Sequence, residues 1–400
     1  MLISDIVINI SKYLPTKDLI KYRLTCKDYK KILTTEYVYK KRWFTLRKEI
    51  KSLKFMKKLS YRAYKINLNR NKNIKDEDFE YLQGVDYIDM SFCSQNTITN
   101  EAFKYLRGIY CLNMSYCNQK TITDEAFKYL KGIKKLKMRK CSQITDKAFE
   151  NLRDITSLDM SFCSQKTITN QAFKHLEGIK NLNMSVCGQE TITDQAFYNL
   201  KGIKKLNMSF CKQKTITDLA FLQLHGIFSL NISGCNQNTI TDNAFKNLKT
   251  IHTLSMSNCT QNTITDNAFQ YLQGIYSLNM ALCNQNTITD NAFQYLQGIH
   301  TLDISDCNQS TISDNAFQYF QGIKILNISN CNQQSITDNA FQYLKGIHTL
   351  DMSGCNQESI TINAFLNLKG IHTINISNCN KNSTISIITN HLQDVSFLEI

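Results

Sequence analysis

Proline and tryptophan are nearly missing from this sequence, which has one of each, Pro15 and Trp43, among its 400 residues. Long apolar runs are also missing: no stretch approaches the roughly 20 residues that a membrane-spanning helix needs. A secretory pattern is absent, because Asp5 interrupts the first apolar stretch and no basic segment precedes it. We therefore expect an intracellular protein of the cytoplasm, with the nucleus as an alternative, and no membrane partner.

Motifs of catalysis are missing too. The sequence has no GxSxG nucleophile motif, no glycine-rich phosphate loop and no HExxH zinc motif. Its hydrophobic content of 42% is enough for a substantial core. The sequence therefore favours a binding protein that is not an enzyme and that holds neither a cofactor nor a metal.

Charge is concentrated at one end of the chain. Residues 1–70 hold 19 basic and 5 acidic residues, so they account for the whole net charge of +14. A solvated basic surface on helices explains this excess. The alternatives are an acidic protein partner, and nucleic acid or an anionic membrane. We favour the solvated surface and expect no specific nucleic acid.

A 24-residue repeat, typified by GIxxLNMSxCNQxTITDxAFxYLx, fills most of the sequence. Its cysteines recur from Cys93 to Cys379 at intervals of 24 residues, except for 22 between Cys141 and Cys163. A degenerate first unit carries Asn71 at the cysteine position. The pattern predicts 15 strands and 14 intervening turn-and-helix segments.

Each repeat divides into a strand and a short helix. Residues 278–281 alternate apolar and polar side chains, as a half-buried strand does. Thr289 or Asp290 suits the N-cap of the helix, and Gly298 suits its end, where a positive φ is expected. The side chains expected on the buried face of the helix are Ala292, Phe293 and Leu296. One strand and one helix cannot bury their apolar faces alone, so the units must stack.

This repeat resembles the cysteine-containing class of leucine-rich repeats, through its LxxLxMxxC and ITDxAFxxL segments. The resemblance implies an α/β solenoid. In that fold, a leucine-rich-repeat horseshoe, a parallel sheet lines the inside and short helices line the outside. The unit is slightly short for that class, and Ala-Phe replaces its usual small residue and leucine after ITD.

The evenly spaced cysteines invite a metal or redox interpretation, but their geometry disfavours it. Strand neighbours lie about 4.8 Å apart, whereas the Cβ atoms of a disulfide lie about 3.8 Å apart. Zinc ligands also cluster in the sequence, and these cysteines do not. We expect buried thiols that donate weakly to backbone carbonyls.

Histidines recur at the entrance to the strands, two positions before the central apolar residue: His252, His300, His348 and His372. The repetition follows from the repeat itself. We interpret this row as solvated surface, and a pH-sensitive or binding edge is the alternative.

The N-terminal residues follow a different, helical pattern that resembles an F-box. Leu2–Val7 stands where that family has Leu-Pro-x-Glu-Ile-Leu, and Tyr13–Leu19 matches its central Leu-Pro-x-x-Asp-Leu. Residues 25–29 stand where it has Val-Cys-Lys-x-Trp. Ile3 replaces a proline and Tyr29 replaces the tryptophan, which puts the affinity for a partner in doubt.

An F-box followed by leucine-rich repeats implies the substrate-recognition subunit of a Skp1–cullin–F-box ubiquitin ligase. The F-box would bind a Skp1-like adaptor in the cullin complex, by packing apolar helix faces into a groove. The residues that the resemblance assigns to Skp1 are Ile6, Ile10, Leu14, Pro15 and Leu19. A place in the module's own core is an equal alternative for Ile6 and Ile10. An interaction scaffold without ligase recruitment is the alternative. The composition is also similar to that of F-box/leucine-rich-repeat proteins of giant amoebal viruses, which would imply host cytoplasm and a host ligase.

These observations divide the chain into three parts. We expect a small all-α F-box-like module over residues 1–44 and a solenoid of about 14 units over residues 63–400. Between them, residues 45–62 alternate Leu46, Ile50 and other apolar residues with lysines. This pattern predicts a basic amphipathic linker helix that caps the first repeat.

The inner face of the sheet is where solenoids usually bind their partners. Outward-facing residues there are monotonous in the second half, as at Asn279 and Ser305, but not in the first half. The 22-residue spacing belongs to a unit rich in lysine and arginine, and aromatic residues precede several cysteines. Such residues suit an unknown protein substrate, acidic or phosphorylated, although drift of an older repeat is an equal alternative. The candidate substrate-binding residues are Phe92, Tyr116, Lys135, Lys137, Arg139, Lys140, Phe162 and Phe210.

Overall fold

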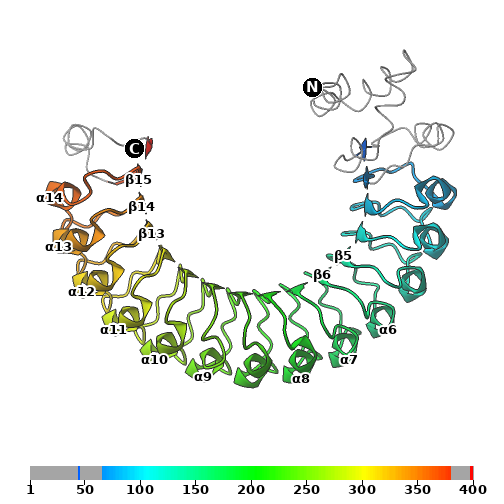
Figure 1. Cartoon of the computed structure of the whole chain (residues 1–400), viewed down its shortest axis with the longest axis horizontal. Helices are drawn as coiled ribbons and strands as arrows, with labels where there is room; N and C mark the ends of the chain where they lie inside the picture. Colours follow the sequence, from blue (N-terminus) through cyan, green and yellow to red (C-terminus); the bar gives the residue numbers. More distant parts are fainter. Residues whose placement is uncertain (1–43, 46–64, 380–396, 400) are drawn as a thin grey trace, which may run out of the picture. The chain divides into compact units, whose positions relative to one another are not determined.

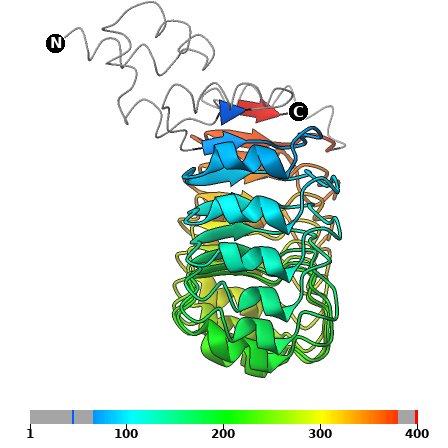
Figure 2. The ribbon, with the colours of Figure 1, turned by 90° about the vertical axis from the view of Figure 1, so that its right-hand side faces the viewer.

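The computed structural model of the chain describes residues 44–45, 65–379 and 397–399. It divides into two units, Met1–Ile179 and Lys180–Ile400. In each unit, parallel strands line the inner side of the curve and short helices line the outer side (Figure 1). The helices of the first unit stack above one another when viewed from the side (Figure 2). The predicted α/β solenoid is therefore confirmed.

The first unit contains six described strands and five described helices, most of them in the 3-10 form. Its strands are β1 (Phe44–Thr45), β2 (Lys65–Asn67), β3 (Tyr87–Asp89), β4 (Cys111–Asn113), β5 (Lys135–Lys137) and β6 (Ser157–Asp159). Its helices are η1 (Asp76–Leu82), η2 (Asn100–Leu106), η3 (Asp124–Tyr129), α6 (Asp146–Phe149) and α7 (Asn170–Phe173).

The second unit repeats the same plan, often with a 3-10 turn directly after the α-helix. Its strands are β7 (Asn181–Asn183), β8 (Lys205–Asn207), β9 (Ser229–Asn231), β10 (Thr253–Ser255), β11 (Ser277–Asn279), β12 (Thr301–Asp303), β13 (Ile325–Asn327), β14 (Thr349–Asp351), β15 (Thr373–Asn375) and β16 (Phe397–Glu399). Its helices are α8 (Asp194–Phe197), η4 (Tyr198–Leu200), η5 (Asp218–Gln223), α9 (Asp242–Phe245), α10 (Asp266–Phe269), η6 (Gln270–Leu272), α11 (Asp290–Phe293), η7 (Gln294–Leu296), α12 (Asp314–Phe317), η8 (Gln318–Phe320), α13 (Asp338–Phe341), η9 (Gln342–Leu344) and α14 (Ile362–Leu366).

Strands within a unit pair in parallel and in register, with equivalent residues of successive repeats side by side. Leu254 faces Leu278, and Leu278 faces Leu302. The strands from β2 onward are three residues long, and β11 ends at Asn279 because the chain turns shortly afterwards, with a positive φ at Leu282. All 15 predicted strands are present as β2 to β16. The sheet also begins earlier than residue 63, since β1 pairs with β2.

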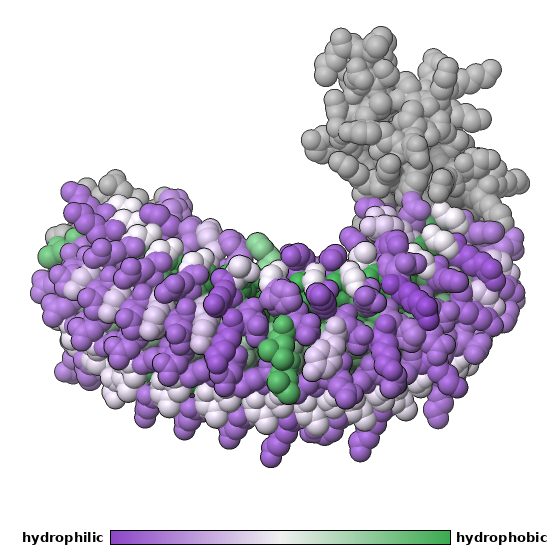
Figure 3. All heavy atoms as spheres, turned by 60° about the horizontal axis from the view of Figure 1, so that its bottom comes forward, coloured by the Kyte–Doolittle hydropathy of each residue, from purple (hydrophilic) through white to green (hydrophobic). Residues whose placement is uncertain are grey.

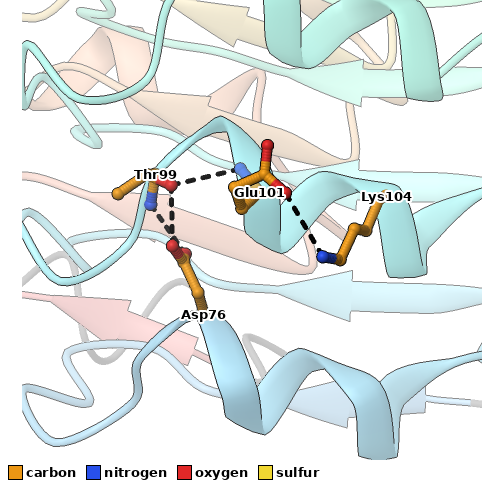
Figure 4. Close-up of polar contacts among 4 residues, drawn as sticks. All are labelled: Asp76, Thr99, Glu101 and Lys104. Carbon is orange, nitrogen blue, oxygen red and sulfur yellow. Dashed lines mark hydrogen bonds and ion pairs between the residues drawn. The ribbon is translucent and has the colours of Figure 1, made fainter.

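In most repeats an aspartate–threonine contact sets the start of the helix and joins neighbouring repeats. Thr99 caps η2, because its hydroxyl accepts a hydrogen bond from the Glu101 amide at 3.1 Å. Asp76 of the preceding repeat accepts from both the Thr99 amide (2.8 Å) and the Thr99 hydroxyl (2.6 Å) (Figure 4). The predicted cap is thus resolved in favour of the threonine, as at Thr289. The aspartate that follows this threonine does not cap its own helix, and it accepts hydrogen bonds from the next repeat instead.

Phenylalanine side chains from the helices fill the space between sheet and helices. Ala292, Phe293 and Leu296 are buried as predicted. Gly298, which ends this helical segment, has a φ of 81°, a conformation that disfavours residues with a Cβ. The outer face is mostly hydrophilic (Figure 3), although the η5 side chains Leu219 and Leu222 are 52% and 43% exposed.

The repeated cysteines from Cys93 to Cys355 are buried, and their thiols donate to carbonyls of the preceding repeat, which confirms their predicted structural role. The Cys117 thiol donates to the Met90 carbonyl at 3.1 Å. Burial raises the pKa of the Cys93 and Cys163 thiols to about 11, so both stay protonated and weakly nucleophilic near neutral pH. In several repeats a glutamine two residues after the cysteine adds a second link, as when the Gln119 amide donates to the Cys93 carbonyl at 3.1 Å.

Two of the predicted regions lie outside the described residues. The F-box-like module falls almost entirely within residues 1–43, and the linker helix falls within residues 46–64. Among the residues that the structure describes, no helix is long and apolar enough to cross a membrane.

Candidate binding surface

The β5 repeat departs most strongly from the others on the inner face. Lys135 and Lys137 flank buried Leu136, and both lysines are exposed. In the strand register, Lys137 lies between Asn113 and Asp159. The sequence prediction placed these two lysines correctly on the inner face.

The β5 repeat lacks a hydrogen bond that the adjoining repeats make, because Lys137 stands at the position of the acceptor. At the end of the adjoining strands, an Asp or Asn side chain accepts from the amide two residues later. Asn113 accepts from Ser115 at 3.1 Å, and Asp159 accepts from Ser161 at 3.0 Å. A lysine side chain has no acceptor, so the β5 repeat gives up a contact of about 1 kcal/mol.

Aromatic residues occupy a second costly position, directly before the cysteine. There φ is 60° at Phe92, 62° at Tyr116 and 61° at Phe162. Left-handed backbone costs a residue with a Cβ about 1–2 kcal/mol. Glycine takes the position at Gly234, without that cost. The same conformation recurs at this position in other repeats, as at Val186 (58°), and it leaves the Phe92 ring 40% exposed.

These residues form a column along the rim of the sheet, which we call the cation–aromatic column. The Phe92 and Tyr116 rings stack with centroids 4.3 Å apart. The Arg70 guanidinium lies 5.1 Å from the Phe92 ring. The Arg139 guanidinium lies 5.7 Å from the Tyr116 ring and 4.4 Å from the Phe162 ring. Sequence reasoning placed the aromatic residues on the inner face, but they lie in the turn after each strand, because their φ is positive.

A second row crosses the inner face beside this column. Lys65 lies 4.9 Å from the Tyr87 ring, Tyr87 lies 5.4 Å from Tyr110, and Lys135 lies 5.8 Å from the Tyr110 ring. The sequence analysis missed Lys65, Arg70 and the two tyrosines. Lys65 and Arg70 lie in or beside the degenerate first repeat, where a departure from the consensus carries little signal.

Positive charge dominates this surface. None of the surface cations Arg70, Lys135, Lys137, Arg139 and Lys140 belongs to the ion pairs found in residues 65–379. The nearby carboxylates of Asp89 and Asp159 are already engaged, each accepting a hydrogen bond from a serine hydroxyl. Guanidinium groups fixed against rings are pre-organised for carboxylate or phosphate oxygens. The surface is suited to an anionic ligand.

The 22-residue length of this repeat is not what distinguishes the candidate surface. After the 22-residue unit, the Gln165 amide donates to the carbonyls of both Cys141 and Ile144. Gln95 makes the same pair of bonds to Asn71 and Ile74. The degenerate first repeat is also short, because Asn71 precedes Cys93 by 22 residues. Shortening is therefore accommodated in the same way twice, and the basic side chains are what distinguish the β5 repeat.

Seven of the eight candidate substrate-binding residues lie in neighbouring repeats of the first unit. The eighth, Phe210, belongs to the second unit, where its ring lies so close to Gly234 that a Cβ there would be 2.6 Å away. The residues assigned to Skp1 lie outside the described residues.

Comparisons with known proteins agree with the repeat architecture. The profile of the BspA type leucine rich repeat region matches residues 48–180, 142–276 and 262–392, so the match covers most of the chain. The F-box domain profile matches residues 1–41. A search of curated proteins finds no match. The family match identifies BspA type repeats, whereas the sequence analysis inferred the cysteine-containing class.

Several solved structures share the fold. The Toll–Spatzle complex of Drosophila aligns at 13% identity over 78% of this chain and 43% of that chain, with a TM-score of 0.59. The TLR13–ssRNA13 complex aligns at 19% identity over 83% and 57%, with a TM-score of 0.60. An internalin from Listeria monocytogenes aligns at 18% identity over 82% and 89%, with a TM-score of 0.51. This chain spans about half the length of the first two proteins.

Proposed function

Because the chain belongs to the BspA type leucine rich repeat family and carries an F-box match at its N-terminus, we propose that it is a substrate-recognition subunit of a Skp1–cullin–F-box ubiquitin ligase. The F-box would bind a Skp1-like adaptor, and the repeats would hold the target protein. The chain itself would supply binding and no catalysis. If it is viral, as its resemblance to proteins of giant amoebal viruses suggests, the ligase would be that of the host.

The cation–aromatic column and the β5 lysines carry the proposal for target binding. They combine unpaired positive charge, exposed rings and a backbone whose geometry is costly to maintain. An acidic or phosphorylated segment of the target protein fits this chemistry, because carboxylate and phosphate oxygens would accept from Arg139 and the lysines.

Adaptor binding is tested by co-purification of the full chain with Skp1. Leu14→Ala/Pro15→Ala should abolish it, since these residues form the assigned interface, along with Ile6, Ile10 and Leu19. Lys137→Glu/Arg139→Glu, far from this module in sequence, should leave it intact. A folded Leu14→Ala/Pro15→Ala variant that still binds Skp1 would refute the assigned interface.

Target binding is tested separately, with arrays of acidic, phosphorylated and neutral peptides. Lys137→Glu/Arg139→Glu should abolish capture of acidic and phosphorylated peptides. Lys166→Glu, which reverses an exposed lysine in the loop after β6, should change it little. Unchanged capture by the double variant at low salt would exclude the β5 repeat as the binding surface.

A scaffold that no longer recruits a ligase is the second candidate. Ile3 and Tyr29 favour it, because they replace the proline and tryptophan of the F-box pattern. Target capture without any Skp1 binding by the unmodified chain would select this candidate.

A further inference from the structure

The residue directly before each strand of the second unit forms a continuous row, which we call the strand-entry row. Where this residue is lysine, its amine bonds to the next repeat. Lys204 donates to the Gly226 carbonyl at 3.1 Å, and Lys324 donates to the Gly346 carbonyl at 3.3 Å. Where the residue is aromatic or histidine, stacking of rings replaces this bond.

Four consecutive repeats stack their rings in this row. The centroids of Phe228 and His252 are 4.6 Å apart, those of His252 and Tyr276 are 4.6 Å apart, and those of Tyr276 and His300 are 4.4 Å apart. Phe228 is 46% exposed and Tyr276 is 42% exposed. The row is thus at the surface, as predicted for its histidines, but its side chains are held in place by one another.

A second stack continues the row beyond Lys324. The rings of His348 and His372 lie 4.5 Å apart, at an angle of 16°. Each imidazole Nδ1 lies 3.0 Å from the hydroxyl of the threonine that follows it.

The loops that lead into these strands carry cations and no carboxylates. Within residues 201–205, 225–229, 249–253, 273–277, 297–301, 321–325, 345–349 and 369–373, there is no Asp or Glu. Their cationic and titratable residues are Lys201, Lys204, Lys205, His225, Lys249, His252, His300, Lys324, Lys345, His348, Lys369 and His372. Five of the seven histidines of the chain therefore gather on one edge of the second unit.

The nearest carboxylates in sequence are already engaged. Asp303 and Asp351, on the strands that follow His300 and His348, each accept a hydrogen bond from a serine hydroxyl at 2.7 Å. Asn279 also donates to Asp303 at 3.1 Å. The aspartates that start the helices bond to the threonine or serine of the next repeat, as Asp290 does.

We propose that the strand-entry row of the second unit binds an acidic polypeptide segment, and that binding tightens as its histidines become protonated. Each imidazole has cations nearby in its own or an adjacent loop: Lys249 for His252, Lys324 for His300, and Lys324 and Lys345 for His348. These cations would attract the carboxylates of a bound segment, and protonated imidazoles would add further positive charge to the row.

A polypeptide fits the row better than single-stranded nucleic acid does. Proteins that bind single strands without sequence preference stack bases on open ring faces. Here the inner ring faces are covered by neighbouring rings, so His252 and Tyr276 offer mainly their edges. The inference needs neither the F-box nor the β5 repeat, and so it goes beyond the proposed function.

The test uses the full chain and a rhodamine-labelled polyaspartate peptide, with fluorescence anisotropy at constant ionic strength. We expect affinity about tenfold higher at about pH 5.5 than at about pH 7.5, where imidazole is mostly neutral. His252→Tyr/His300→Tyr/His348→Tyr/His372→Tyr should abolish this difference while keeping rings in the row, as Tyr276 already does. Tyr276→His should enlarge the difference.

Three controls make the outcome decisive. Equal affinity at the two pH values, or a full pH dependence in the four-tyrosine variant, would overturn the proposal. Lys137→Glu/Arg139→Glu should keep the pH dependence, and its loss there would assign the effect to the β5 repeat instead. If oligothymidine or phosphatidylserine vesicles bound more tightly than the peptide through the same histidines, the assignment to an acidic polypeptide would be wrong.

Discussion

The contact between Asp242 and Thr265 allows a quantitative test of what joins neighbouring repeats. Asp242 accepts from the Thr265 amide and from its hydroxyl, both at 2.7 Å. Thr265 in turn caps α10, accepting from the Asn267 amide at 3.2 Å. Because each hydrogen bond to a carboxylate contributes about 1.5 kcal/mol at its lower limit, Asp242→Ala should cost about 3 kcal/mol.

One repeat of the chain already carries a milder substitution at this position. Asn100 stands at the equivalent position, accepts from the Thr123 amide at 2.8 Å and donates to its hydroxyl at 2.9 Å. Asp242→Asn should therefore keep both contacts without the charge, and cost about 1 kcal/mol. Asn243→Ala, which alters the exposed neighbouring side chain, is the matched control and should cost less than about 0.5 kcal/mol.

Hydrogen exchange of the Thr265 amide is the suitable assay, because a repeat array need not unfold in one step. A cost of about 3 kcal/mol corresponds to a loss of protection of about a hundredfold, against less than tenfold for Asp242→Asn. Equal effects of the alanine and asparagine variants would refute the reasoning, since they would show that the oxygen acceptor at this position contributes nothing.

Four further predictions follow from single residues. Val186→Gly should raise the free energy of unfolding by about 1 kcal/mol in urea titrations, because this β-branched residue has a φ of 58°. Lys137→Asn should restore the strand-end hydrogen bond and stabilise the fold by about 1 kcal/mol, yet weaken capture of acidic peptides. Between about pH 9 and 11, stability under reducing conditions should fall by about 1.4 kcal/mol per pH unit for each of Cys93 and Cys163. Burial raises their pKa to about 11, so the unfolded chain loses these protons first. Half-exposed Cys111 should react with a thiol reagent before the buried cysteines of the described repeats do.

The repeat architecture was predictable because the same sequence pattern recurs in successive repeats. Strand positions, the buried face at Phe293 and the positive φ at Gly298 each recur in register, so a chance pattern is excluded. The N-cap was ambiguous from sequence, since Thr289 and Asp290 are both good caps. Only the structure shows that the aspartate bonds to the following repeat rather than to its own helix.

The candidate surface was only partly predictable. Charge and aromatic content picked out Lys137 and Phe92, since they depart from the consensus. Sequence could not show that Arg139 lies between two rings, because that depends on side-chain directions across adjacent strands. The stacking of His252 between Phe228 and Tyr276 was missed for the same reason.

Three recurring hydrogen bonds between repeats run in the same direction along the chain. The Cys117 thiol and the Gln119 amide donate to carbonyls of the preceding repeat, and the Thr265 amide donates to Asp242 of the preceding repeat. Backbone amides after the strands donate in the opposite direction, as Met90 does to the Asn113 carbonyl at 2.8 Å, so successive repeats meet through the same set of contacts. Whole repeats can therefore be gained or lost by recombination, because any two repeats meet through the same kind of junction. The length of the inner face can thus evolve separately from the chemistry that it displays.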